Sequence, residues 1–168
     1  MMIKMSTVNS LALAVSLIAG CYSGPPLPPT VRFDLPPGWE EIQKAPGYVS
    51  IGDFSLEGSE VPQHKIETIP KRMFEGDRVS AHQFIDEYYD HLTRPGEEVE
   101  EREVLEVSLP SGGVVYANIS PGGFGGGEGT IFAFAKDGYV IPMYLNDHIE
   151  NHIGAVDTIV QSASIITD

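Results

Sequence analysis

The fold is decided by one stretch, Thr130-Ile131-Phe132-Ala133-Phe134-Ala135-Lys136-Asp137-Gly138-Tyr139-Val140-Ile141-Pro142-Met143-Tyr144-Leu145. Two runs in it, Thr130 to Ala135 and Tyr139 to Leu145, are rich in the apolar and aromatic residues of buried strands. Between them, Lys136-Asp137-Gly138 contains an Asp-Gly pair, which supplies the positive φ that tight antiparallel turns need. The stretch therefore predicts an antiparallel hairpin.

Further strands are predicted on the amino-terminal side of this hairpin. In each segment, apolar and polar residues alternate or branched apolar residues lie together. Turn residues separate most of the segments. The segments are Val31 to Leu35, Tyr48 to Leu56, Lys65 to Ile69, Val104 to Leu109 and Val114 to Ile119. After the first of them, Pro36-Pro37-Gly38 forces a turn ahead of Trp39, which we expect to anchor the core.

Two helices are predicted to interrupt the strands. Ser80 is placed to cap the first helix, and Arg94-Pro95-Gly96 stops it. Its apolar stripe consists of Ala81, Phe84, Ile85, Tyr88 and Leu92. The stripe of the second helix consists of Ile149, Ile153, Val156, Val160 and Ala163, at helical spacings of three and four. Helices that each bury one face against an antiparallel sheet predict an α+β sandwich of two or three layers.

The amino terminus carries a separate signal, Leu17-Ile18-Ala19-Gly20-Cys21. It follows one positive charge at Lys4 and an apolar run from Leu11 to Ala19, which is too short to span a bilayer and is typical of a signal peptide. Cys21 is the only cysteine, so it has no disulfide partner within the chain. The alternative to a signal peptide is a buried helix that ends in Gly-Cys. The stretch resembles the bacterial lipobox.

This resemblance implies cleavage before Cys21, a diacylglyceryl thioether on its sulfur and often a third acyl chain, such as palmitate, on the new amino terminus. Two or more acyl chains hold a protein stably on a membrane without crossing it. Tyr22 stands where an Asp would favour retention in the inner membrane. We therefore expect a lipid anchor, in the outer membrane facing the periplasm if the cell has two membranes.

Three segments follow from these signals: a signal peptide at residues 1–20, the lipidated cysteine with a tether at 21–30, and a single domain at 31–168. The tether has four prolines among residues 22–30, and in the polyproline II conformation it reaches roughly 28 Å. Pro25-Pro26-Leu27-Pro28 within it could instead be a Pro-x-x-Pro ligand for a partner.

The mature domain is strongly acidic. Residues 1–20 contain one of the 10 Lys and Arg residues and none of the 24 Asp and Glu residues, so the remaining chain has a net charge of 9 − 24 = −15. The negative electrostatic field of this domain disfavours binding to nucleic acids and anionic lipid surfaces, and it favours binding to cations or basic partners. We therefore expect no nucleic-acid binding.

Several patterns together resemble the PsbP-like superfamily, which includes a photosystem II extrinsic subunit and DcrB-like envelope lipoproteins. They are the run Phe33 to Trp39, the central amphipathic helix, the paired late strands, and the closing Val156 to Ser162. The resemblance implies an antiparallel sheet flanked by helices and a non-enzymatic binding or assembly role. The resemblance implies no catalytic residues and no cofactor.

A glycine-rich segment, Pro121 to Gly129, is the most biased stretch of the domain. Backbone amides in such a loop can hold a phosphate, but the known phosphate-loop spacings do not fit, and Glu128 would repel an anion. We expect a mobile connection between strands. Phe124 would be its exposed apolar tip and a point of partner contact.

Histidine and carboxylate residues suggest two further sites. His148 and His152 lie four residues apart with Asp147 and Glu150 nearby, a spacing that places both imidazoles on one helical face and could bind a divalent metal. The alternative is a solvated helix start, and no third ligand can be named. His82 and Asp86, one turn apart on the first helix, predict a surface contact.

The acidic run from Glu97 to Glu106 contains six carboxylates in ten residues and could attract Ca²⁺ or a basic protein. It lacks the alternating oxygen ligands and the central glycine of a calcium loop, so a solvated connection that discourages aggregation is the alternative.

Nucleophilic catalysis has little support. Ser111 lies in Pro110-Ser111-Gly112-Gly113 without a nucleophile elbow, and Cys21 would be consumed by lipid. The sequence predicts a membrane-anchored, non-enzymatic protein-binding or assembly module of the envelope, with no catalytic, cofactor or metal residue assigned. The alternative is a lipoprotein that binds a divalent cation or a small ligand through His148 and His152 or through the acidic run.

Overall fold

The computed structural model describes residues 29–68, 71–72, 80–88, 103–120 and 128–166. Along the chain the elements are β1 (Thr30–Arg32), β2 (Trp39–Ala45), β3 (Tyr48–Asp53), β4 (Lys65–Thr68), β5 (Lys71–Arg72), α1 (Ala81–Glu87), β6 (Leu105–Ser108), β7 (Val114–Ser120), β8 (Gly129–Lys136), β9 (Tyr139–Leu145), the 3₁₀ helix η1 (Ile149–His152), α2 (Ile153–Ser162) and β10 (Ser164–Ile166). The lipobox, Cys21 and the tether up to Pro28 lie outside these residues.

The predicted hairpin is confirmed. β8 and β9 pair antiparallel from Lys136 opposite Tyr139 to Thr130 opposite Leu145. The two residues between the strands, Asp137 and Gly138, have φ values of 50° and 80°. Positive φ at both central positions is the geometry that a two-residue turn needs to match the twist of its strands.

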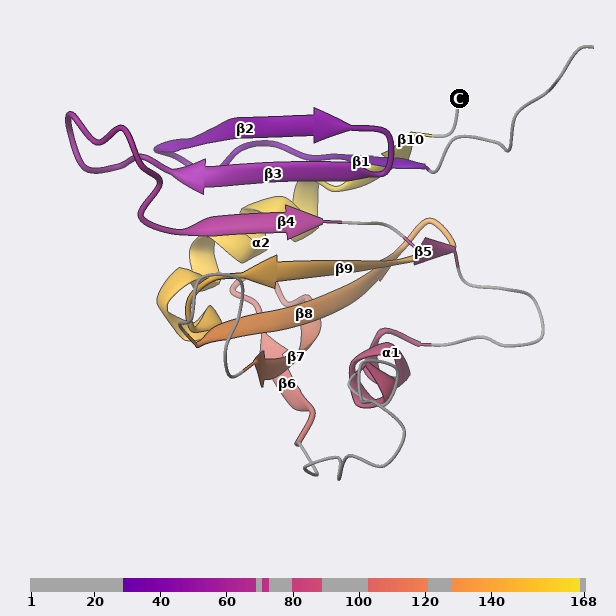
Figure 1. Cartoon of the computed structure of the whole chain (residues 1–168). Helices are drawn as coiled ribbons and strands as arrows, with labels where there is room; N and C mark the ends of the chain where they lie inside the picture. The colour runs from indigo at the N-terminus through magenta and orange to yellow at the C-terminus, as the bar shows by residue number, and fades with distance from the viewer. Residues whose placement is uncertain (1–28, 69–70, 73–79, 89–102, 121–127, 167–168) are drawn as a thin grey trace, which may run out of the picture.

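The main sheet is antiparallel throughout, in the order β2-β3-β4-β9-β8-β7-β6, and the short β5 also pairs with β9 (Figure 1). A second sheet joins the two ends of the domain, because β1 pairs with β10. The amide of Asp34 adds a hydrogen bond to the Ser162 hydroxyl near this pair. The start and the end of the described domain therefore lie side by side.

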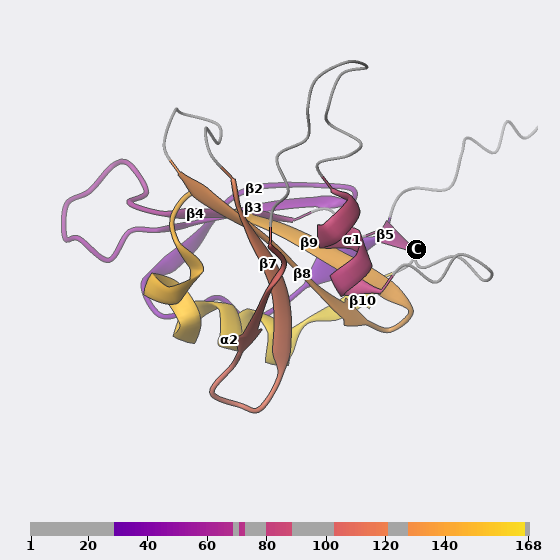
Figure 2. The ribbon, with the colours of Figure 1, turned by 90° about the horizontal axis from the view of Figure 1, so that it is seen from below.

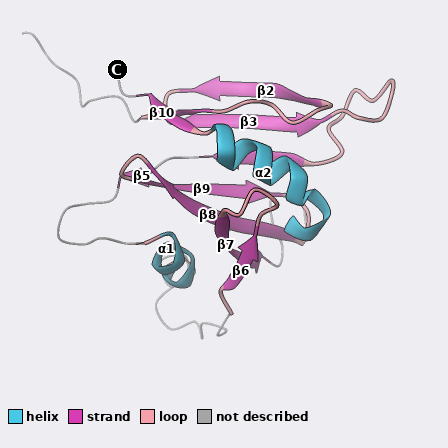
Figure 3. Ribbon diagram, turned by 180° about the vertical axis from the view of Figure 1, so that it is seen from behind, coloured by secondary structure: helices cyan, strands magenta, loops and turns pink. Residues whose placement is uncertain are grey.

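In the described part of the chain the sheet has one helix on each face, which confirms the α+β class. α2 lies behind the sheet in Figure 1 and in front of it in Figure 3, whereas α1 lies against the opposite face (Figures 2 and 3). Alternate residues of β8 serve the two faces: Phe132 packs in the core with α2, and Ile131 packs with α1. A strand buried on both faces explains why the run is apolar without alternation.

Both predicted helices are present. For the first, Leu92 and the predicted stop at Arg94-Pro95-Gly96 lie outside the described residues. The Ser80 hydroxyl accepts a hydrogen bond from the amide of Gln83, as an N-cap does. In α2, Val156 and Ile159 are fully buried, whereas the predicted Val160 is only partly buried. The α-helix also begins later than the predicted stripe, because residues 149–152 form the 3₁₀ turn η1 and α2 begins at Ile153.

Three strands were not predicted: β2, β5 and β10. In β2 only Trp39 is buried, so its sequence shows no apolar alternation, and its strand character comes from pairing with β3 at the edge of the sheet. Two predicted strands are shorter than expected, because β1 ends at Arg32 and β3 ends at Asp53. Trp39 is a core residue, as expected.

Among the described residues, no helix combines the length and the apolar character that a membrane span requires.

Candidate functional site

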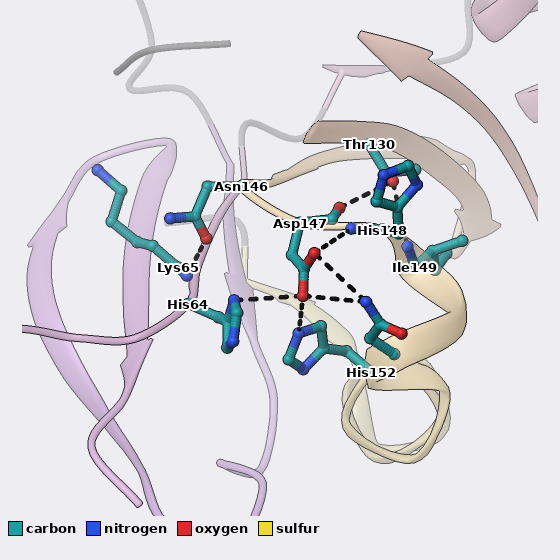
Figure 4. A network of polar contacts seen from close by, with 9 residues as sticks. His64, Lys65, Thr130, Asn146, Asp147, His148, Ile149 and His152 are labelled. Atoms are coloured by element: carbon teal, nitrogen blue, oxygen red, sulfur yellow. Dashed lines mark hydrogen bonds and ion pairs between the residues drawn. The ribbon is translucent and has the colours of Figure 1, made fainter. Parts of the chain in front are cut away.

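Three side chains of metal-binding type converge beside the carboxyl end of β9 (Figure 4). Asp147 follows β9, His152 ends η1, and His64 ends the loop between β3 and β4. The Asp147 Oδ2 atom lies 2.8 Å from His152 Nε2 and 3.4 Å from His64 Nδ1. One ligand atom from each residue lies within 4.8 Å of the other two. We call these residues the His64–Asp147–His152 cluster.

Backbone pairing fixes where the cluster forms. The Thr130 hydroxyl donates to the carbonyl of Asp147 at 2.9 Å and accepts from the amide of Ile149 at 3.2 Å. The backbone amide of Asn146 donates to the carbonyl of Lys65, and the side-chain oxygen of Asn146 accepts from the backbone amide of Lys65. The turn after β9 is therefore held against β8 on one side and against β4, which begins next to His64, on the other.

The Asp147 carboxylate is held in place by donors. Its Oδ1 atom accepts from the amide of His148 at 2.8 Å, and Asn151 Nδ2 lies 3.3 Å from Oδ2. Burial by itself raises the pKa of Asp147, but the His148 amide, the His152 ring and Asn151 outweigh it and hold that pKa below its ordinary value. The carboxylate is therefore charged at neutral pH, with Oδ2 directed at the two imidazoles.

His64 is the unusual member of the cluster. Its Nδ1 atom is buried and has no hydrogen-bond partner, although Asp147 Oδ2 lies within ion-pair distance. A buried nitrogen without a hydrogen bond costs about 1–3 kcal/mol. The His64 ring also packs against the ring of His152, with centroids 4.3 Å apart. This nitrogen would gain from any partner placed between the three side chains.

His148, which the sequence analysis considered together with His152, does not join the cluster. His148 precedes η1 in an extended conformation, and its Nε2 lies 3.1 Å from Glu128. The four-residue spacing joins two side chains in an α-helix but not across the start of a 3₁₀ turn. Glu150 is exposed and lies outside the cluster. The third member of the cluster, His64, belongs to a loop far earlier in the chain, and the sequence carries no spacing that could have identified it.

Ser111 is bound by two side chains of α2. Its hydroxyl donates to the Asp157 carboxylate and accepts from Gln161 Nε2, which ties the turn between β6 and β7 to α2. These contacts give the serine a structural role. A groove of about 610 Å³ lies near this turn, with an apolar lining that includes Val114, Phe134 and Val160.

The other predicted residues add little to the site. His82 packs edge-on against Tyr116, with ring centroids 5.2 Å apart. Residues 121–127 of the glycine-rich segment, which include Phe124, and most of the acidic run lie outside the described residues.

No family model matches the chain, and no curated protein matches it. Among solved structures, the chain is similar to LpqN of Mycobacterium tuberculosis, which is described as involved in cell envelope biogenesis. The two are 16% identical, the match covers 87% of this chain and 88% of LpqN, and the TM-score is 0.44. A likeness at this level carries no information about activity.

Proposed function

We propose that the protein is a lipid-anchored domain of the cell envelope that works by binding another envelope protein rather than by catalysis. Two features of the sequence support the proposal: the lipobox at Cys21 and the resemblance to the PsbP-like and DcrB-like domains. The structure contributes one observation that carries the proposal, which is the loop between β3 and β4.

This loop, residues 54–64, exposes two large apolar side chains. Leu56 is 58% exposed and Val61 is 68% exposed, the highest values among the exposed large apolar residues of the described chain. In Figure 1 the loop projects beyond the ends of the β-strands. Apolar side chains that project from a loop on a rigid sheet are suited to insert into a partner's surface.

The loop is also ordered by its own hydrogen bonds. The Ser59 amide donates to the carbonyl of Leu56 at 3.1 Å, and the Ser59 hydroxyl donates to the carbonyl of Val61 at 2.6 Å. At the base, the amide of Gln63 donates to the carbonyl of Asp53 at 2.8 Å. A preordered loop loses less conformational entropy on binding, so it can bind a protein with few contacts.

Charge indicates what kind of partner fits. Glu57 and Glu60 stand beside the two apolar residues, and residues 54–63 contain no Lys or Arg. The partner surface should therefore be apolar at its centre and basic at its rim.

The test is site-specific photo-crosslinking in intact cells that produce the lipidated protein. A photo-reactive residue at position 61 should give one saturable crosslinked product, identified by mass spectrometry. The same residue at position 166 is the matched control, because Ile166 is also an exposed apolar residue but lies in β10, next to β1. The Cys21→Ala form should lose the product if anchoring is required.

The crosslinked protein is then purified and its affinity is measured directly. Leu56→Ser and Val61→Ser should each weaken binding about tenfold or more, the effect of losing a central apolar contact. Glu60→Gln should reduce the association rate and make it less sensitive to salt. Equal crosslinking from positions 61 and 166, or unchanged affinity of both serine variants, would contradict the proposal.

A further inference from the structure

We propose that the His64–Asp147–His152 cluster is a binding site for a divalent transition-metal ion of the Zn²⁺ type. His64 Nδ1, Asp147 Oδ2 and His152 Nε2 would supply three ligands, and a fourth position would remain open to solvent. The proposal does not rest on the proposed protein-binding function, although His64 ends the loop that carries Leu56 and Val61.

The donor set selects the class of ion. Two neutral imidazole nitrogens and one carboxylate oxygen suit Zn²⁺ and its neighbours Cu²⁺ and Ni²⁺. Ca²⁺ takes six to eight oxygen ligands and Mg²⁺ keeps oxygen and water around it, so neither fits a site with two nitrogen donors. The net charge of the protein, −14, adds a general attraction for cations.

The two distances that involve Asp147 are close to those of a metal site, and all three ligand atoms lie within 4.8 Å of one another. Ligand bonds of about 2.0–2.1 Å at a tetrahedral angle place neighbouring ligand atoms roughly 3.3 Å apart. His64 Nδ1 and Asp147 Oδ2 are 3.4 Å apart. His152 Nε2 and the same oxygen are 2.8 Å apart, so the metal would replace this hydrogen bond as the two atoms separate by about half an ångström.

A second observation points to a missing partner. His64 Nδ1 is buried and makes no hydrogen bond, even though Asp147 and His152 surround it with polar atoms. A metal ion would satisfy this nitrogen, since its lone pair is available for coordination in one neutral tautomer.

The carboxylate is already oriented as a ligand. Asp147 Oδ1 is occupied by the amide of His148, and Asn151 contacts both oxygens. Donors of this kind hold a ligand in its binding orientation and raise metal affinity. The side chains of His64 and Asp147 are 32% and 21% exposed, so an ion and an exchangeable fourth ligand can reach the site from solvent.

The experiment uses the full chain, purified in detergent and freed of metal with a chelator. Zinc chloride is titrated by calorimetry, and copper chloride by quenching of Trp39, the only tryptophan, whose ring lies 5.9 Å from the ring of His152. We expect one saturable site per chain for each ion. Calcium and magnesium chloride should produce neither heat nor quenching.

Variants assign the site. His64→Ala should lower zinc affinity by at least about 100-fold. This value is the upper range for losing a residue that only supports a metal ligand, and His64 would be a ligand itself. His148→Ala is the matched control, because it removes an imidazole next to Asp147 that pairs with Glu128 instead. Its affinity should stay within about twofold of the wild type, because it keeps the backbone amide that orients the carboxylate.

Imidazole ¹⁵N NMR of the wild-type chain provides a readout that needs no variant. Zinc should shift His64 Nδ1 and His152 Nε2 and leave His82 unchanged. The proposal is overturned if no saturable binding of Zn²⁺, Cu²⁺ or Ni²⁺ occurs, if His64→Ala and His148→Ala bind zinc equally, or if these two nitrogens do not shift.

Discussion

Two connections in the same sheet join neighbouring antiparallel strands in different ways. β8 and β9 are joined by Asp137 and Gly138 alone, whereas β3 and β4 are joined by the loop of residues 54–64. The hairpin buries its strands on both faces, and the loop exposes apolar side chains and carries His64 at its end. The comparison separates two roles: the hairpin supplies buried apolar contacts, and the loop supplies the side chains on which both proposals rest.

The largest expected effect tests this division directly. Phe132→Ala in β8 should lower the free energy of unfolding by about 3–5 kcal/mol, because Phe132 is fully buried in the core with α2. Val61→Ala in the loop should change it by no more than about 0.5 kcal/mol. Urea denaturation followed by circular dichroism measures both. Similar losses in the two variants would show that the loop is part of the core.

A second prediction concerns His64 at the base of the loop. Without metal, His64→Ala should change the free energy of unfolding by no more than about 1 kcal/mol, because the lost ring contact with His152 is offset by removal of a buried nitrogen without a hydrogen bond. With free zinc at 100 times its dissociation constant, the wild type should gain about 2.7 kcal/mol and the variant almost nothing.

Thermal unfolding with and without zinc measures this difference, and His148→Ala should retain the gain of the wild type. A zinc effect of equal size in His64→Ala would place the ion elsewhere.

Two glycines allow the two connections to be compared at one position each. Gly138 in the turn and Gly58 in the loop have φ values of +80° and +79°, and a Cβ atom at either position would meet nothing within 4 Å beyond its chain neighbours. An alanine in this conformation costs about 1–2 kcal/mol. We expect Gly138→Ala to show this full cost, because the two-residue turn has no room to adjust.

Gly58→Ala should cost about half as much or less, because a longer loop can shift its backbone. Chemical denaturation of the two variants measures the ratio. Equal costs would mean that the loop is held as tightly as the turn.

The same contrast explains what the sequence could predict. The hairpin is specified locally, by two apolar runs and an Asp-Gly pair, so its strands and its turn follow from neighbouring residues. β2 could not be predicted, because six of its seven residues are not buried and its pairing depends on β3. Strand character at a sheet edge comes from the neighbouring strand and is not visible in the burial pattern of one segment.

The candidate site was not assigned from the sequence. Asp147, His148 and His152 were considered together, on the assumption of an α-helix, as one possible metal site beside a solvated helix start. The structure has a 3₁₀ turn there, and His64 takes the third place. Convergence of two segments that are distant in sequence depends on tertiary pairing, here of Asn146 with Lys65, which no local pattern encodes.

The smallest predicted effect concerns the strand that leaves the loop. On β4, Glu67 lies 2.7 Å from both the Lys65 ammonium and the Tyr48 hydroxyl. Burial by itself raises the pKa of Glu67, but the hydrogen bonds from Lys65 and Tyr48 and the charge of Lys65 hold it below its ordinary value of 4.5. The unfolded chain therefore binds this proton more readily than the folded chain does.

It follows that Glu67 stabilises the fold fully above its ordinary pKa, and that this contribution is lost as the pH falls through the lowered value. The side chain is partly exposed, so the contribution should be about 0.5 kcal/mol. Glu67→Gln should flatten the pH dependence of the free energy of unfolding below pH 4.5 by that amount.

Hydrogen exchange at acidic pH locates the effect. In the wild type, the amides of β3 and β4 should lose protection before those of β8 and β9, and Glu67→Gln should narrow this gap because it removes the titrating group from β4 alone. If the amides of all four strands lost protection together, acid would be destabilising the domain as a whole. The strands β3 and β4, which flank the loop, would then be as stable as the hairpin strands β8 and β9.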